Sequence, residues 1–238
     1  RTLFELVATD EYPTAATTQA LIRLANCRIL TDSKSYPECL LSLLNAISEV
    51  LAPKTIYLVA DALELLINTP CADIDLRANT AVHLLGLSSR WWNRLDTADQ
   101  LLLRSLSKDL GLETVLPEEV LDDCNQGDLA GGWAQLLNQM TVAIYSLNSS
   151  AMERTVGILR SLSPGIQTKV FSEHVASPSL KEAARNADLF VLATKSAKHA
   201  ATIFISQHRA SKPILYASGK GSSSILDAIR RWAAESLG

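Results

Sequence analysis

Aromatic residues are scarce in this chain, and long apolar runs are missing. Phe, Trp and Tyr make up 5% of the 238 residues and hydrophobic residues 47%, so the core must be mainly aliphatic. No apolar stretch reaches the roughly 18 to 20 residues that a membrane-spanning helix needs, which excludes an integral helical membrane protein. The chain begins at Arg1 without a signal-peptide pattern, so we expect a piece of a longer cytoplasmic protein that makes no membrane contact.

The four cysteines are scattered along the sequence. Cys27, Cys39, Cys71 and Cys124 form no CxxC pair, and no histidine cluster accompanies them. This spacing argues against a zinc site or a disulfide framework and predicts buried free thiols in a reducing compartment. The residues identify no cofactor.

The net charge of −3 conceals an uneven distribution. Residues 1–125 hold 10 Lys and Arg against 18 Asp and Glu, so 10 − 18 = −8, whereas residues 126–238 hold 12 against 7, so 12 − 7 = +5. Such a split predicts two units with different partners. The positive half is the better place for an anionic ligand.

The first half has the periodicity of helices joined by short loops. Apolar residues recur at steps of three and four in windows beginning near Pro37, Pro53, Asp73 and Thr97. Pro53 is expected to open the second helix, Asp73 or Asp75 to cap the third, and Gly86 with the Ser88-Ser89 pair to end it. The spacing has no fixed period, so we predict an all-α helical bundle rather than a solenoid.

Between Gly111 and Trp133 this periodicity gives way to proline, acidic residues and glycine. We place a domain boundary there, with a helical domain over residues 1–127 and an α/β domain over residues 128–238.

Strands and helices alternate in the second half. Strands are expected at 141–147, 168–171, 188–194 and 213–217, and helices at 152–162, 177–187, 199–207 and 222–236. This alternation predicts a Rossmann-like parallel sheet of about four strands with right-handed crossovers. The third strand is the most apolar and is therefore expected at the centre.

Ligands of open parallel sheets bind beyond the carboxyl ends of the strands. Four polar loops, 146–150, 171–174, 194–199 and 218–224, are predicted to meet at that edge. In the last loop, Gly219 and Gly221 would permit positive φ and close backbone approach, Lys220 adds positive charge, and Ser222, Ser223 and Ser224 open a helix whose N–H groups attract anions. The loop matches neither the Walker A pattern nor GxGxxG, and a plain strand-to-helix turn is the alternative interpretation.

The third-strand loop adds further basic residues. Lys195, Lys198 and His199 are predicted to lie beside Lys220, where several cations repel one another unless an anion lies between them. His199 could equally cap or brace its helix. The candidate ligand-binding residues are therefore Thr194, Lys195, Ser196, Lys198, His199, Gly219, Lys220, Gly221, Ser222, Ser223 and Ser224.

The residues give less support to catalysis. Glu173 and His174 could act as a general base and its partner, with a serine at position 146, 172 or 196 as the nucleophile. However, no GxSxG elbow surrounds those serines. Asp188 lies at the amino end of its strand, and no metal-binding spacing occurs. We therefore assign no catalytic residue.

Basic residues also occur at positions 209, 212, 230 and 231, without the aromatic interleaving typical of a nucleic-acid interface.

Several C-terminal motifs resemble a bacterial Rossmann-like domain family of unknown function. They are an Ala-Asp pair opening the strand at 187–194, the Lys-His pair in 197–202, a Lys-Pro strand at 212–216 and the glycine-serine turn at 219–224, with 141–147 as the first strand. The resemblance covers about the last hundred residues. It implies an accessory component of mobile-island or phage-defence gene clusters, including those for deazaguanine DNA modification, and it supplies no catalytic residues.

We therefore expect a non-catalytic module that senses a ligand or binds a nucleotide or other phosphate-bearing small molecule, with a helical domain that contacts a partner protein. The alternatives are a purely structural protein–protein interaction module and an enzyme acting on a phosphorylated or nucleic-acid substrate. Direct binding to nucleic acid has the weakest basis among the expected partnerships.

The two-domain interpretation predicts where a protease cuts first. Limited proteolysis should cleave between Gly111 and Gly132, and a fragment from about Ala130 to Gly238 should fold alone. A cooperative thermal melt of that fragment checks the prediction. An insoluble fragment without such a melt would mean that both halves share one core.

Overall fold

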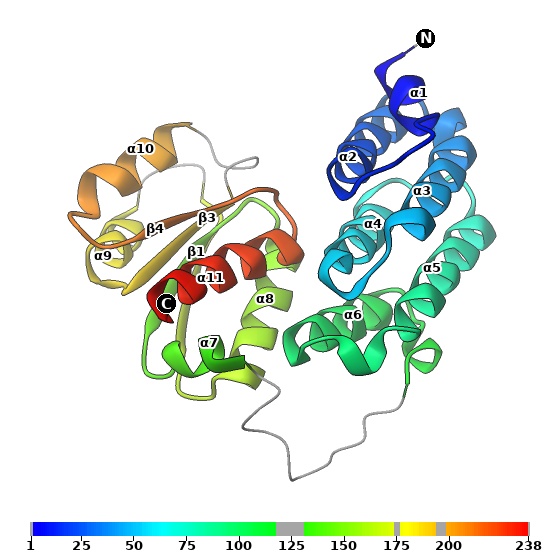
Figure 1. The fold of residues 1–238 in the computed structure, drawn as a ribbon. Coiled ribbons are helices and arrows are strands. Elements are labelled where there is room, and N and C mark those ends of the chain that lie inside the picture. Colours follow the sequence, from blue (N-terminus) through cyan, green and yellow to red (C-terminus); the bar gives the residue numbers. More distant parts are fainter. Residues whose placement is uncertain (1, 118–130, 174–176, 194–198, 238) are drawn as a thin grey trace. The chain divides into compact units, whose positions relative to one another are not determined.

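The computed structural model describes residues 2–117, 131–173, 177–193 and 199–237 (Figure 1). It divides into two compact units, one formed by Arg1–Leu95 and Asp99–Leu121, the other by Asp96–Ala98 and Asp122–Gly238. The boundary predicted near residue 128 lies in the stretch 118–130, outside the described residues. No helix within the described residues is long and apolar enough to cross a membrane.

The first unit is helical, as the sequence predicts. Its helices are α1 (Leu3–Ala8), α2 (Ala15–Thr31), α3 (Tyr36–Val50), α4 (Tyr57–Asn68), α5 (Ile74–Ser89) and α6 (Thr97–Asp109), with the 3-10 turns η1 (Ser33–Ser35), η2 (Pro53–Thr55), η3 (Trp92–Arg94) and η4 (Glu113–Val115). The helices α3 to α6 correspond to the four that the periodicity predicts, and α1 and α2 precede them without having been predicted.

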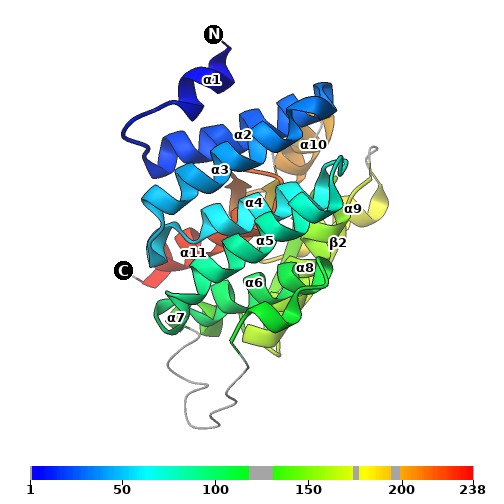
Figure 2. The same ribbon diagram turned by 90° about the vertical axis from the view of Figure 1, so that its right-hand side faces the viewer.

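The helices of this unit pack as stacked pairs. Helix α2 packs against α3 and α4, α5 packs against α3 and α4, and the tiers are visible in Figure 2. Pairs of this kind resemble the packing of helical-repeat proteins more than a closed bundle. The sequence has no fixed period because the helices differ in length, so periodicity alone did not indicate the stacking.

One helix boundary differs from the sequence-based expectation and another agrees with it. Pro53 begins the short turn η2, and α4 starts only at Tyr57. Helix α5 is capped by Asp73, whose Oδ1 accepts a hydrogen bond from the Leu76 N–H at 2.8 Å, and it passes through Gly86 to end at Ser89, within the predicted serine pair. A glycine inside a helix costs only about 1 kcal/mol, and the buried neighbours Leu84 and Leu85 offset that cost.

The expected burial of the thiols holds only in part. Cys39 is buried, and this burial raises its pKa, whereas Cys71 is half-buried and Cys27 is exposed. Cys27 lies on the outer side of α2, away from the buried positions Ala25 and Ile29. Cys124 lies outside the described residues.

The second unit contains α7 (Gly131–Leu136), β1 (Thr141–Tyr145), α8 (Ser149–Leu162), β2 (Gln167–Phe171), α9 (Pro178–Asn186), β3 (Leu189–Ala193), α10 (His199–His208), β4 (Ile214–Ala217) and α11 (Ser222–Leu237). The strands form one parallel sheet in the order β2-β1-β3-β4. Helices α8 and α11 pack together, as do α9 and α10, and Figure 1 shows these pairs on opposite faces of the sheet. The predicted α/β fold of four parallel strands is confirmed.

The centre of the sheet is fully apolar. All five residues of β3 are buried, as the sequence predicts for a central strand, and so are four of the five in β1. On the side of α9 and α10 the core also contains Tyr145, Phe171 and Phe190, with the two phenylalanine rings stacked at 6.4 Å. These rings add aromatic packing to a core that is otherwise mainly aliphatic.

The amino-terminal edge of the sheet is organised by one buried arginine. Arg209 follows α10 and is only 1% exposed, and its guanidinium donates to backbone carbonyls alone among the described partners. Nη1 donates to the carbonyl oxygens of Ala184 (3.1 Å) and Ala187 (2.6 Å), and Nη2 donates to that of Asp188 (2.9 Å). Both Nε and Nη2 also donate to the Pro213 carbonyl, at 3.1 and 2.9 Å. The side chain therefore joins the end of α9 to the starts of β3 and β4.

Replacing this arginine should destabilise the second unit strongly. Arg209→Met keeps a similar length but leaves several buried carbonyls without a donor, so we expect a loss of about 3 to 5 kcal/mol in the free energy of unfolding. Arg231→Met is the matched control, because Arg231 is exposed and only pairs with Asp227 on the same helix, so it should cost under about 0.5 kcal/mol. Denaturant titration of both variants measures the difference. Equal midpoints would show that the carbonyl contacts contribute little.

Candidate functional site

The strand order creates a switch point between β1 and β3. From β1 the chain crosses to β2 on one side, and from β3 it crosses to β4 on the other. The connections that leave the carboxyl ends of β1 and β3 therefore diverge, which is where open α/β sheets bind ligands. Of the four predicted loops, residues 146–150, 171–173 and 218–224 are described here. Residues 194–198 lie outside the described part of the chain, and so does the side chain of His199, the first residue of α10.

The end of β1 is occupied by a tightly hydrogen-bonded turn. The buried Ser146 donates its N–H to the Phe171 carbonyl at 3.0 Å, and its Oγ accepts the Asn148 N–H at 3.1 Å. Asn148 in turn caps α8, because its Oδ1 accepts the Ala151 N–H at 3.2 Å. The Ser146 hydroxyl thus helps to hold the strand-to-helix turn.

Three consecutive serines begin α11, and all three are buried. Ser222, Ser223 and Ser224 are between 0% and 6% exposed and lie in the first turn of the helix, which begins at Ser222. The Ser222 hydroxyl accepts a hydrogen bond from Nε of Arg154 at 3.3 Å. This bond connects the starts of α8 and α11 at the same edge of the sheet.

Arg154 was not selected by the sequence analysis. It is buried on α8, on the face that also carries Ala151 and Ile158. The signal was available, because positions 151, 154 and 158 follow the helical spacing of a buried stripe. An arginine on such a stripe indicates a buried guanidinium with hydrogen-bond partners, since burying this group without partners costs much free energy.

The glycine loop differs from the expectation in one respect. Neither Gly219 nor Gly221 has a positive φ; the glycine of the described residues with that conformation is Gly111. Gly219 is needed for space, since a Cβ there would lie 2.5 Å from Ser224 Oγ and 3.3 Å from Ser224 Cβ. The loop thus needs this glycine for close packing against the first turn of α11.

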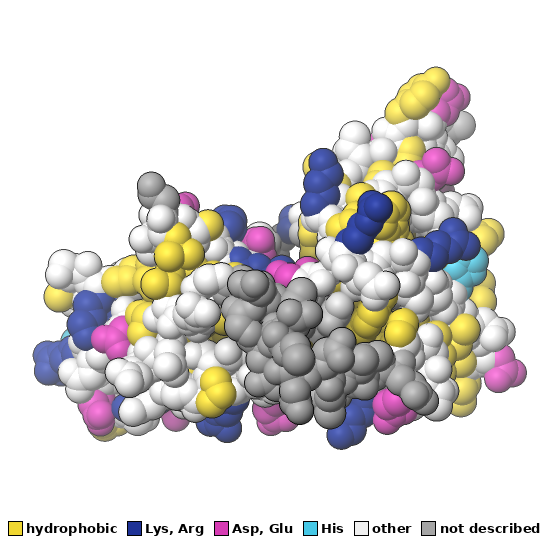
Figure 3. Space-filling view, turned by 60° about the horizontal axis from the view of Figure 1, so that its bottom comes forward, with side chains coloured by type: hydrophobic (Ala, Val, Ile, Leu, Met, Phe, Trp, Pro, Cys, Tyr) yellow, Lys and Arg dark blue, Asp and Glu magenta, His cyan; other side chains and the backbone are white. Residues whose placement is uncertain are grey.

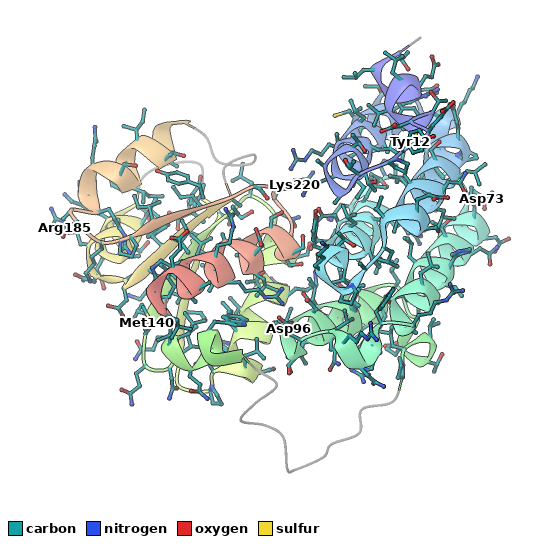
Figure 4. The ribbon with its side chains drawn as sticks, viewed as in Figure 1. Tyr12, Asp73, Asp96, Met140, Arg185 and Lys220 are labelled. Atoms are coloured by element: carbon teal, nitrogen blue, oxygen red, sulfur yellow. The ribbon has the colours of Figure 1, made fainter. Side chains whose placement is uncertain are left out.

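Lys220 is exposed between Gly219 and the start of α11, and Figure 4 labels it there. Its predicted neighbours Lys195 and Lys198 lie outside the described residues, so the convergence of the three lysines stays a prediction.

Several residues considered for catalysis have structural contacts in the described part of the chain. The Glu173 carbonyl accepts a hydrogen bond from the Tyr145 hydroxyl at 2.8 Å, and this buried hydroxyl has a raised pKa because of desolvation and the nearby Glu173 charge. Asp188 lies at the amino-terminal edge, as predicted, where its Oδ2 accepts the Thr141 N–H. His174 lies outside the described residues. Among the residues that are described, no group of three His, Cys, Asp or Glu could hold a metal ion.

Most of the basic residues considered for nucleic-acid contact have structural roles. Arg209 is buried, Lys212 donates to the Asn186 carbonyl at 2.8 Å, and Arg231 pairs with Asp227 at 3.0 Å. On the face shown in Figure 3, Lys and Arg side chains are interspersed with Asp and Glu. These contacts weaken the interpretation of this cluster as a nucleic-acid interface.

Comparison with protein families gives a match over almost the whole sequence. A family model described as DpdD-like matches residues 1–228. The chain belongs to the DpdD-like family. The expected resemblance of the last hundred residues alone was too narrow, since the match also covers the helical unit, and the expected association with defence is supported at the level of the family. Neither the comparison with curated proteins nor that with solved structures gave a match to this DpdD-like chain.

The close packing in the glycine loop of this DpdD-like protein can be tested by adding one methyl group. Gly219→Ala forces Ser224 to move in a buried position, so we expect a loss of about 1 to 3 kcal/mol in stability. Gly157→Ala in α8 is the control, because a Cβ there meets nothing within 4 Å and should stabilise the helix by roughly 0.5 to 1 kcal/mol. Thermal melts of both variants would show the opposite signs. A neutral or stabilising Gly219→Ala would contradict the packing argument.

Proposed function

We propose that this DpdD-like chain binds a phosphate-bearing ligand, such as a nucleotide, at the carboxyl edge of its sheet and acts as a sensing module rather than an enzyme. The observation that carries the proposal is the link between Arg154 and Ser222, which joins the starts of α8 and α11 beside the switch point of the sheet. In this proposal the helical unit contacts a partner protein within a defence-associated bacterial assembly.

The electrostatics of this edge favour an anion. Helices α8 and α11 have 14 and 16 residues, and the amino end of each carries partial positive charge that favours an anion. The guanidinium of Arg154 adds a full charge in a buried position, where charge-assisted hydrogen bonds are strong. Lys220 supplies a further, exposed charge. Phosphate groups suit such a combination of arginine, lysine and backbone N–H donors.

The same residues support binding over catalysis. The Ser146 hydroxyl accepts a hydrogen bond within its own turn, and the Glu173 carbonyl is bonded to Tyr145. A nucleophile and a base need to be within hydrogen-bonding reach of each other. The described residues provide serine hydroxyls and cations at this edge without such a pair.

A second candidate function is a purely structural interaction module. Large apolar side chains of the helical unit are unusually exposed: Leu3 (63%), Leu6 (52%), Tyr12 (83%), Leu30 (57%) and Leu41 (62%). Exposed apolar residues of this kind are typical of protein interfaces when they are grouped together. On this alternative the sheet edge would serve only to hold the fold.

Ligand-dependent stabilisation distinguishes the two candidates. A panel of nucleotides and inorganic phosphate should contain a compound that raises the melting temperature, and at about 100 times its dissociation constant the gain is roughly 2.7 kcal/mol. Lys220→Ala should weaken binding of that compound and reduce its salt dependence, while changing stability by less than about 0.5 kcal/mol.

Lys108→Ala is the matched control for this experiment. Lys108 is exposed on α6, so its substitution changes the net charge equally but alters a residue of the other unit. It should leave ligand binding unchanged. If no compound of the panel stabilises the protein, or if Lys220→Ala binds the ligand as tightly as the unaltered chain does, the structural alternative is preferred.

A further inference from the structure

The two outer strands of the sheet are protected to different degrees. Sheet edges present unpaired N–H and C=O groups, and proteins usually guard them with charged side chains, lysine above all. In β2, Lys169 pairs with Glu182 at 3.4 Å, and the Thr168 hydroxyl accepts a hydrogen bond from Arg160. By contrast, residues 213–219, which contain β4, carry no charge.

The backbone of β4 offers a defined set of free groups. Phe190 pairs with Ile214 and donates its N–H to the Pro213 carbonyl, so the alternating groups of Pro213, Leu215 and Ala217 face β3. The N–H and C=O groups of Ile214 and Tyr216 therefore point outward. Within the described residues β4 ends the sheet, and in Figure 1 the strand lies in the foreground at that edge.

The side chains of β4 are also incompletely covered. Tyr216 is 51% exposed and Ile214 is half-buried, and both lie on the α9 and α10 face of the sheet because they are two residues apart. An aromatic and a β-branched residue that face each other across antiparallel strands form a stabilising pair. The edge is thus apolar as well as unpaired.

We infer that β4 pairs with β4 of a second copy of this chain, antiparallel about a twofold axis, to give a continuous eight-stranded sheet. Centred on Leu215, this pairing places Ile214 of each copy opposite Tyr216 of the other, so every outward N–H meets an outward C=O. In the same register Lys212 falls opposite Ser218, and no like charges face each other over the seven uncharged residues. The edge is therefore complementary to itself in backbone, apolar contact and charge, as an isologous interface requires.

The size of the paired edge sets the strength to expect. Four residues extend only about 13 Å, so the interface lies at the small end of specific interfaces, where association is weak. We therefore expect a reversible dimer in the micromolar range that depends on protein concentration.

Sedimentation velocity of the full 238-residue chain over a wide concentration range tests this pairing. Tyr216→Lys places a charge on the edge in the way natural edges are protected, and it should raise the dimer dissociation constant by about tenfold or more. Tyr216→Phe should leave dimerisation unchanged. The matched control is Val170→Lys, at a residue of β2 that is 49% exposed, which should also leave the dimer intact.

Each outcome decides for or against the pairing. A dimer that is lost in Tyr216→Lys, with an unchanged melting temperature, and kept in Val170→Lys supports it. A monomer at all concentrations overturns it, and so does a dimer that Val170→Lys disrupts while Tyr216→Lys does not. If Tyr216→Lys melts at a lower temperature, Ile214→Lys provides a second test on the same edge. The result of this experiment does not bear on the ligand-binding proposal, because that proposal is tested by ligand-induced stabilisation.

Discussion

The guanidinium of Arg209 donates hydrogen bonds at an edge of the sheet where several carbonyl groups would otherwise be buried without donors. Helices end with carbonyls that have no partner within the helix, and in a parallel α/β unit those ends lie beside the starts of the strands. Arg209 supplies donors to the end of α9 and to the starts of β3 and β4. Its burial lowers its pKa, an effect that the charge of Asp188 opposes, yet the group is held by five hydrogen bonds. A cation near a helix carboxyl end is also favoured by the helix dipole.

Because the amino-terminal edge is fixed in this way, the opposite edge can be built from loops. The turns after β1 and β4 are held by Ser146, Asn148 and the serines of α11, and Arg154 joins them. The two arginines thus have complementary positions, one at each end of the strands. One stabilises carbonyls, and the other adds positive charge where a phosphate is proposed to bind.

The sequence predicted most elements of the second unit because each has its own local signal. The β-branched run at β1, the apolar run at β3, the Ser177 cap of α9 and the serine-rich start of α11 depend on short-range preferences, and the structure has them at nearly the expected residues. The errors occurred where tertiary packing decides. Gly219, for example, is required by the position of Ser224 rather than by its own φ.

The buried arginines illustrate the limit of sequence reasoning most clearly. Arg209 was grouped with surface cations, since a sequence gives the charge of a residue but not the carbonyls that will surround it. Arg154 lay on a helical stripe of buried residues and could have been noticed from its spacing. The family match over residues 1–228 likewise extends beyond the motifs of the last hundred residues, so the helical unit belongs to the family as much as the sheet does.

The strand order also affects the order in which the elements of the second unit are expected to fold. Strands β1 and β2 pair across a single helix, whereas β3 must insert on the other side of β1, with Val142 opposite Leu189. Closing the longer loop costs more entropy, so the β1–α8–β2 unit is expected to form first. The carbonyl partners of Arg209 come together only after α9 and β3 have docked. Its hydrogen bonds therefore form late, and interactions that form late chiefly slow unfolding rather than speed folding. We therefore expect Arg209 to lower the unfolding rate of the second unit more than it raises the folding rate.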